Sequence, residues 1–302
     1  MLSVIESVNA AVNNFIWGVP AMICIIGVGL YLSIRTNFLQ IRKFPYAIRV
    51  TIGRMLRKRE ASDGSLTPFQ AVCTALAATV GTGNIAGVAG AIAIGGPGAV
   101  FWMWVTALLG SSTAFVEATL AQLHKEKDPL YGGYRGGPAY YIHNFFTRKS
   151  QTKPRYSLIA VLFAISGLIC WCGISQVISN SVSTAFSNAF HIPPLYTTIL
   201  LVLLAAVIVL RKNATVKVLD IMVPIMAGCY FFITLFIIFK NIGQLPAVFH
   251  HIFSEAFGLR QVAAGGFGAV LMNGVKRGLF SNEAGSGSAP CASAAADVDH
   301  PA

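Results

Sequence analysis

Long apolar runs alternate with short polar linkers along the whole chain. A run of about 20 apolar residues is long enough to cross a bilayer as a helix, and the pattern predicts about seven such segments. We number them in chain order: about Phe15–Ile34, Pro68–Ile94, Ala99–Leu123, Ser157–Phe190, Leu195–Leu210, Val216–Lys240 and a seventh that starts near Gln261. The pattern therefore predicts an all-α polytopic membrane protein, in which residues 1–302 form a single transmembrane domain.

Segment two contains, near its middle, the stretch TVGTGN of residues 79–84. Glycine and β-branched residues weaken a helix, so we expect the helix to be broken here. In hydrocarbon an unwound turn leaves backbone groups unpaired at several kcal/mol each, and it persists only where it faces protein, water or a bound solute. The break is therefore a candidate site, and Gly81 and Gly83 place it about half-way along the segment.

Segment seven is the second apolar segment that glycines interrupt. It passes through Gly265-Gly266, Gly268 and Asn273-Gly274, and then through SNEAGSGSAP. Two interrupted segments in corresponding positions are typical of transporters with inverted repeats, which bind substrate and coupling ion near the midplane. Glycine repeats also allow close helix packing. Asn84 favours the site, because a carboxamide at the midplane must find partners and can donate to a substrate carboxylate.

Two further polar features lie within the apolar segments. Gln176 of segment four is at the depth of the break, and Ser179, Asn180 and Ser183 follow it along one helical face. This stripe either lines the site or bonds neighbouring helices. Glu117 of segment three is either a proton relay or the partner of a basic residue in the adjacent loop, and we favour the pairing.

The composition supports a membrane protein: 55% of the residues are hydrophobic, 11% are charged, and the mean hydropathy is +0.66. The net charge of +11 does not indicate nucleic-acid binding, because the basic residues lie between apolar runs, where they orient the chain. Three linkers on one side hold 18 of the 22 Lys and Arg residues, and we assign Lys276 and Arg277 to the inner end of segment seven. The N-terminus is therefore predicted to lie outside.

The sequence contains no enzyme constellation. The six histidines lie in loops or at segment ends, and the serine-rich stretch near Ser286 lacks the G-x-S-x-G turn that follows a strand. We therefore expect a protein that is not an enzyme.

Residues 95–110, GGPGAVFWMWVTALLG, closely resemble the signature of the sodium:alanine (alanine or glycine:cation) symporter family, and GTGNIAGVA and GLFSNEAGSGSAP resemble further family blocks. The resemblance implies Na⁺-coupled import of alanine, glycine or a similar small neutral amino acid, by alternating access through a LeuT-type fold in the cell membrane. Residues 1–35 are then a peripheral first span, residues 67–240 a first five-helix repeat, and residues 261–302 the start of a second repeat whose C-terminal part is missing. The alternatives are an inactive fragment and a non-coupled membrane pore.

The resemblance also implies roles for particular residues. The substrate-binding candidates are Gly81, Thr82, Gly83, Asn84, Gln176, Asn273 and Gly274. The sodium-binding candidates are Thr79, Val80 and Thr82. The expected partners are the amino acid, Na⁺ as coupling ion and the lipid bilayer, with no nucleic acid and no other cofactor.

The predicted sidedness can be tested by cysteine labelling in a variant without the six native cysteines. A cysteine near Ser3 should react with a membrane-impermeant reagent added outside, and a cysteine near Ser62, in the basic linker, should not. The reverse labelling would overturn the sidedness and with it the assignment of the fold.

Overall fold

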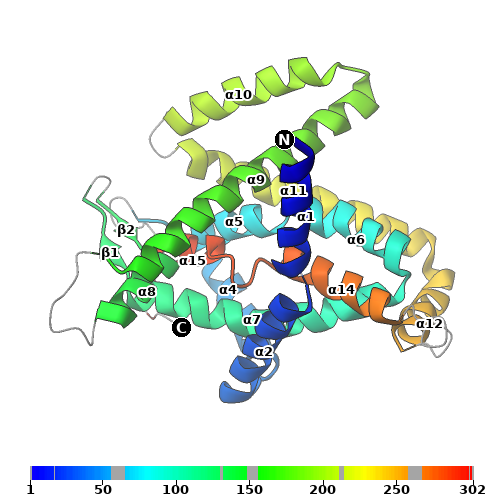
Figure 1. Cartoon of the computed structure of the whole chain (residues 1–302), viewed down its shortest axis with the longest axis horizontal. Helices are drawn as coiled ribbons and strands as arrows, with labels where there is room; N and C mark the ends of the chain where they lie inside the picture. Colours follow the sequence, from blue (N-terminus) through cyan, green and yellow to red (C-terminus); the bar gives the residue numbers. More distant parts are fainter. Residues whose placement is uncertain are drawn as a thin grey trace. The chain divides into compact units, whose positions relative to one another are not determined.

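A computed structural model describes residues 2–16, 18–55, 65–129, 132–147, 156–210, 214–257, 267–298 and 300. Helices make up most of this part of the chain (Figure 1). The helices up to the hairpin are α1 (Leu2–Ile16), α2 (Val19–Arg35), α3 (Leu39–Arg42), α4 (Phe44–Met55), α5 (Pro68–Thr79), α6 (Thr82–Gly95) and α7 (Gly98–Leu123). Strands β1 (Glu126–Lys127) and β2 (Tyr134–Arg135) form a short antiparallel hairpin. The later elements are α8 (Pro138–Thr147), α9 (Leu158–Phe190), α10 (Pro194–Leu210), α11 (Ala214–Lys240), η1 (Ile242–Gln244), α12 (Leu245–Ala256), α14 (Phe267–Asn282) and α15 (Ser288–Ala295).

Apolar helices occupy the first six predicted segments. Within the described residues, four stretches are long and apolar enough to cross a membrane: Pro68–Gly95, Gly98–Leu123, Leu158–Phe190 and Thr215–Lys240. Two shorter apolar helices, Val19–Arg35 and Pro194–Leu210, match segments one and five. The prediction of an all-α polytopic membrane protein is confirmed. The predicted start of segment seven, residues 261–266, lies outside the described residues, and the LeuT-type arrangement stays a prediction.

Local sequence signals explain where several helices begin. Thr67 caps α5, because its hydroxyl accepts from the Gln70 amide at 3.2 Å while its own amide donates to the Gln70 side chain at 3.0 Å. Pro68 follows at the first helical position, where a missing N–H leaves no bond unmade. Gly96, with φ of 76°, makes the turn between α6 and α7, a backbone conformation that glycine adopts without strain.

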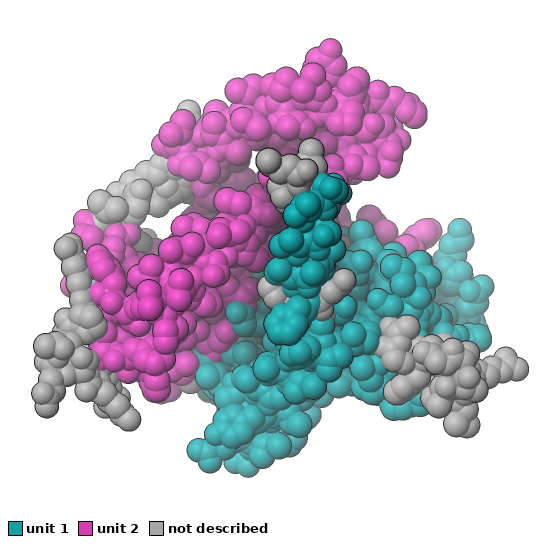
Figure 2. All heavy atoms as spheres, viewed as in Figure 1, with its two compact units in different colours: residues 1–52, 83–116, 238–285 teal, residues 53–82, 117–237, 286–302 magenta. Residues whose placement is uncertain are grey.

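The chain divides into two compact units (Figure 2). Unit 1 comprises residues 1–52, 83–116 and 238–285. Unit 2 comprises residues 53–82, 117–237 and 286–302. Unit 1 therefore contains α6 and α14, and unit 2 contains α5 and α15.

Small residues allow the helices of unit 1 to approach closely. A Cβ atom at Gly274 of α14 would lie 2.6 Å from the Ala99 carbonyl oxygen and 2.7 Å from Cβ of Trp102, both on α7. Between α2 and α7, the Ser33 hydroxyl donates to the Ser112 hydroxyl at 3.0 Å, and both side chains are buried. Close backbone approach and polar bonds of this kind hold helices together in lipid, where burial of apolar surface contributes little.

In unit 2, α5 and α15 are joined through the strand-like residues at their ends. Leu66 pairs with Ala296 in a parallel bridge. Gln122, at the end of α7, donates to the carbonyl oxygens of Ser293 and Ala296, and Lys125 donates to Ala296 at 3.3 Å. The Ser293 carbonyl also accepts from the Ala296 amide at 3.1 Å, so these side-chain bonds tie the end of α7 to the last turn of α15.

Two helices lie outside the predicted segments: α1 precedes segment one, and α12 lies in the linker that follows segment six. One assignment needs correction. Lys276 and Arg277 do not lie at the inner end of segment seven but in the middle of α14. The next residue, Gly278, packs against Met103 and Thr106 in the first third of α7, which places this part of α14 near the Gly96 turn rather than the basic linkers.

The close packing at Gly274 predicts how glycine substitutions affect stability. Gly274→Ala should lower the free energy of unfolding by about 1 to 3 kcal/mol, because the methyl group would overlap backbone and side-chain atoms of α7. Gly90→Ala, on α6, is the matched control: no atom lies within 4 Å of its Cβ position, and alanine favours the helix. Thermal unfolding in detergent measures both variants, and equal midpoints would contradict the packing of α14 on α7.

Candidate functional site

The helix of segment two is interrupted where the sequence predicts it. Helix α5 ends at Thr79 and α6 begins at Thr82. Val80 between them has φ of −87° and ψ of 91°, an extended conformation that no α-helix can pass through. The prediction of a broken helix is confirmed.

Each side of this interruption carries backbone groups of one kind. The last carbonyl groups of α5 have no amide partner further along that helix, apart from Leu76, which accepts from the Val80 amide at 2.8 Å. The first amide groups of α6 likewise have no helical carbonyl to bond. Because of the helix dipoles, the end of α5 favours a cation and the start of α6 favours an anion.

Segment seven is interrupted as well, after Asn282. Helix α14 ends at Asn282 and α15 begins at Ser288. The residues between them include Glu283, Gly285 and Gly287, with φ of 52°, 92° and 89°. Asn273 and Gly274, the substrate-binding candidates of this segment, lie inside α14 and not at its interruption.

Unit 1 brings the start of α6 against the end of α14. The Ser281 hydroxyl donates to the side-chain oxygen of Asn84. A Cβ atom at Gly83 would lie 3.0 Å from Cδ1 of Phe280, so the phenyl ring packs directly on the glycine. The Asn282 side chain donates to the Thr106 carbonyl on α7 at 3.3 Å. Two helix ends that belong to different segments are therefore held side by side.

This arrangement suits a small zwitterion. The amide end of α6 carries partial positive charge, and the carbonyl end of α14 carries partial negative charge. A free amino acid has a carboxylate for the first and an ammonium group for the second. The Asn84 oxygen accepts from Ser281. The nitrogen of the same side chain carries the donors, and a donor is what a carboxylate bonds.

The other predicted site residues belong to unit 2. Thr79, Val80, Gly81 and Thr82 precede Gly83 directly in the chain. Gln176 lies on an exposed face of α9. The roles of these residues in binding substrate and sodium stay predictions.

Two of the neighbouring polar residues have structural partners. Ser183, the buried member of the stripe on α9, lies 3.2 Å from the Thr198 hydroxyl of α10, so this residue bonds a neighbouring helix. Glu117 faces Tyr141 on α8, outside the spanning segments: burial and the nearby carboxylate raise the pKa of the Tyr141 phenol. Glu117 thus interacts with the segment that follows the hairpin.

The sequence reasoning did not select Phe280, Ser281 and Asn282. The signal for them was the run EAGSGS of residues 283–288, a cluster of glycine and serine between two apolar stretches, which marks an interruption better than single glycines do. Among the described residues, no group of three or more His, Cys, Asp or Glu could hold a metal ion. A sodium ion would instead need oxygen atoms of the backbone, hydroxyl groups or side-chain amides.

Comparisons with known proteins identify the family of this chain. The model of the sodium:alanine symporter family matches residues 2–302. The probable sodium/glutamine symporter GlnT of Bacillus subtilis is 42% identical over 305 residues, which are 100% of this chain and 61% of the relative. The sodium/alanine symporter AgcS of Methanococcus maripaludis is 41% identical over 292 residues, 96% of this chain and 63% of the relative. The chain therefore spans about three fifths of the length of these curated relatives.

The role of Asn84 can be tested by its removal from a form of the protein with the full length of the relatives. Asn84→Ala should weaken binding of alanine by about 1 to 3 kcal/mol, because a buried carboxylate would lose a donor. Asn144→Ala is the matched control and should bind normally. It removes a bond between α8 and His124, the residue that follows α7. Isothermal titration measures both. Unchanged affinity in Asn84→Ala would show that this residue serves helix packing and not substrate binding.

Proposed function

Because this chain belongs to the sodium:alanine symporter family, whose members are secondary transporters and not enzymes, we propose that its full-length form imports a small neutral amino acid together with Na⁺. The protein is a multi-pass membrane protein. We place it in the cell membrane with the N-terminus outside, in agreement with the distribution of basic residues.

One observation supports the substrate class most strongly: the start of α6 lies beside the end of α14, linked by the bond between Ser281 and Asn84. Helix ends of opposite polarity suit the two charges of an amino acid. These helix ends offer no charged partner to the side chain of the substrate. Selectivity for neutral amino acids therefore needs no further residue. The relatives named as alanine and glutamine symporters both have substrates of this class.

The proposed sodium site lies at the other side of the first interruption. The end of α5 presents carbonyl groups, and Thr79 adds a hydroxyl whose proton is donated to the Ala75 carbonyl at 2.7 Å. A hydroxyl oxygen is also an acceptor, the kind of atom that a cation binds. Hard cations prefer such oxygen ligands, and this supports Thr79, Val80 and Thr82 as the sodium-binding residues.

Alternating access requires two parts that change their arrangement around the site. Two of the five boundaries between unit 1 and unit 2, at residues 82/83 and 285/286, fall within or directly after the two interruptions, and two others fall inside the continuous helices α7 and α11. Each interrupted segment contributes one half to each unit. Extended and glycine residues at the interruptions can absorb changes in backbone angles, which supports a mechanism in which they serve as the flexible points.

We propose alanine or glycine as the substrate rather than a larger amino acid. Gly81 and Gly83 contribute no side chain, and the Phe280 ring occupies the space beside Gly83. A side chain with one more methylene gains little binding energy even in a pocket that it fits. Overpacking against a rigid wall costs more, so such a wall excludes larger side chains sharply. The name of the Bacillus subtilis relative includes glutamine, so the size limit needs a direct test.

Competition for Na⁺-dependent uptake into proteoliposomes provides that test. Unlabelled alanine and glycine should block uptake of labelled alanine, while leucine and phenylalanine should not, because their side chains would overlap the Phe280 ring. Phe280→Ala should allow larger side chains to compete, and a substitution outside the site, Asn144→Ala, should not. Leucine that competes as well as alanine in the unchanged protein would rule out a small-substrate carrier.

The same proteoliposomes distinguish a carrier from an uncoupled pore or an inactive chain. Saturable exchange of labelled alanine that requires Na⁺ is expected of the symporter. Flux that does not saturate would indicate a pore, and no exchange would indicate that the protein is inactive. Either result would contradict the proposed function.

A further inference from the structure

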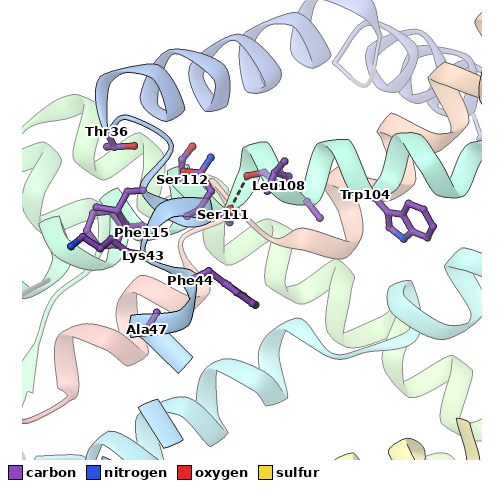
Figure 3. Close-up of a pocket in the computed structure, with 12 residues that line it drawn as sticks. Thr36, Lys43, Phe44, Ala47, Trp104, Leu108, Ser111, Ser112 and Phe115 are labelled. Atoms are coloured by element: carbon purple, nitrogen blue, oxygen red, sulfur yellow. Dashed lines mark hydrogen bonds between the residues drawn. The ribbon is translucent and has the colours of Figure 1, made fainter. Parts of the chain in front are cut away.

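A groove in unit 1 lies apart from the candidate substrate site. It has a volume of about 530 Å³, within the range of ligand sites in proteins. One wall is a single face of α7, and the other is the chain from Thr36 to Ala47, which includes α3 and the first turn of α4 (Figure 3). The residues of α7 that line it are Trp104, Ala107, Leu108, Ser111, Ser112 and Phe115. Their spacing of three and four residues makes one continuous stripe.

The serines in this wall do not make it polar. The Ser111 hydroxyl donates to the Leu108 carbonyl at 2.7 Å, a bond that is visible in Figure 3. The Ser112 hydroxyl is close to the carbonyl oxygens of Gly29 and Leu109, at 2.9 and 2.8 Å. Because these protons are used within the protein, the wall presents mainly carbon surface to whatever occupies the groove.

The groove follows the middle part of a spanning helix. Lys43 lies at the same end as Phe115, and Trp104 lies at the opposite end (Figure 3). Phe115 comes eleven positions after Trp104 on α7, which corresponds to about 16 Å at the rise of an α-helix. Helix α7 continues beyond the groove at both ends, from Gly98 to Leu123. The groove therefore combines a cation at one end with an apolar wall of about 16 Å.

The chain beside the groove has the features of a membrane-surface segment. Residues 35–55 contain five basic and no acidic residues. Helix α4 exposes Phe44, Tyr46 and Ile48 together with Arg49. A basic helix with exposed aromatic and aliphatic side chains lies in the interface, and basic residues next to a spanning helix attract anionic lipid.

From these observations we infer that the groove binds one anionic phospholipid from the leaflet next to the basic linker. The phosphate contacts the Lys43 ammonium, and an acyl chain lies along α7 toward Trp104. A lipid without net charge is a poorer ligand, because its own cationic group would meet Lys43 and its neighbours. A spanning helix from another part of the protein is a poorer occupant too, since it needs about 30 Å of apolar depth, twice the length of the groove. This site is independent of the proposed transport function.

Tryptophan quenching tests the inference in a full-length protein in which Trp104 is the only tryptophan. The protein is placed in nanodiscs of phosphatidylcholine that contain a fixed fraction of brominated lipid. Brominated phosphatidylglycerol should quench Trp104 more strongly than brominated phosphatidylcholine at the same fraction. Lys43→Gln should reduce the apparent preference for phosphatidylglycerol about fivefold, the effect of one basic residue at an anionic membrane surface.

Two controls make the test specific. Arg49→Gln removes one charge from α4 without touching the groove, and it should keep the preference. A protein with Trp171 as its only tryptophan, on the exposed surface of α9, should show no preference. Equal quenching of Trp104 by both lipids, an equal loss in Lys43→Gln and Arg49→Gln, or no contact of lipid with Trp104 because protein fills the groove would each overturn the inference.

A second measurement does not depend on the tryptophan substitutions. Native mass spectrometry of the otherwise unchanged protein, released from vesicles of equal phosphatidylglycerol and phosphatidylcholine, should show one retained phosphatidylglycerol. Lys43→Gln should lose it and Arg49→Gln should keep it. Retention of phosphatidylcholine instead would contradict the anionic preference.

Discussion

The structure depends on one constraint: backbone amide and carbonyl groups within hydrocarbon must have partners. Uninterrupted helices such as α7 and α9 satisfy this constraint internally. The interruptions at Val80–Gly81 and at residues 283–287 do not, and each leaves helix ends without helical partners. Polar side chains gather at these points, where Ser281 bonds Asn84 and Asn282 bonds the Thr106 carbonyl. The proposed sites for the amino acid and the cation lie at these helix ends.

The two interruptions also divide the packing of the protein. Glycines on α14 allow it to lie against α7 in unit 1, whereas backbone pairing and the Gln122 side chain hold α15 to its neighbours in unit 2. Each interrupted segment is thus fixed at both halves and extended only between them. This combination of firmly packed halves and a short non-helical link is what a transporter needs if the site is to open first to one side and then to the other.

Hydrophobic pattern was sufficient to predict the spanning helices, because length and apolarity are local properties. It also located the first interruption, since TVGTGN combines several weak helix formers. It did not single out the position of the second, because glycine has two uses in a membrane helix. Gly274 and Gly278 allow close packing inside α14, while Gly285 and Gly287 adopt positive φ at the true interruption. The contact of Asn84 with Ser281 joins residues 197 positions apart, and no local pattern indicates such a pairing.

Hydrogen exchange of the backbone tests the central claim most directly, because the claim concerns the amide groups at the start of α6. Mass spectrometry of the full-length protein would follow peptides that cover Thr79–Asn84, with and without alanine and Na⁺. If these amides hold the substrate carboxylate, alanine in the presence of Na⁺ should slow their exchange, while leucine should not. Exchange that stays unchanged in this stretch at saturating alanine would contradict a substrate site at the interruption.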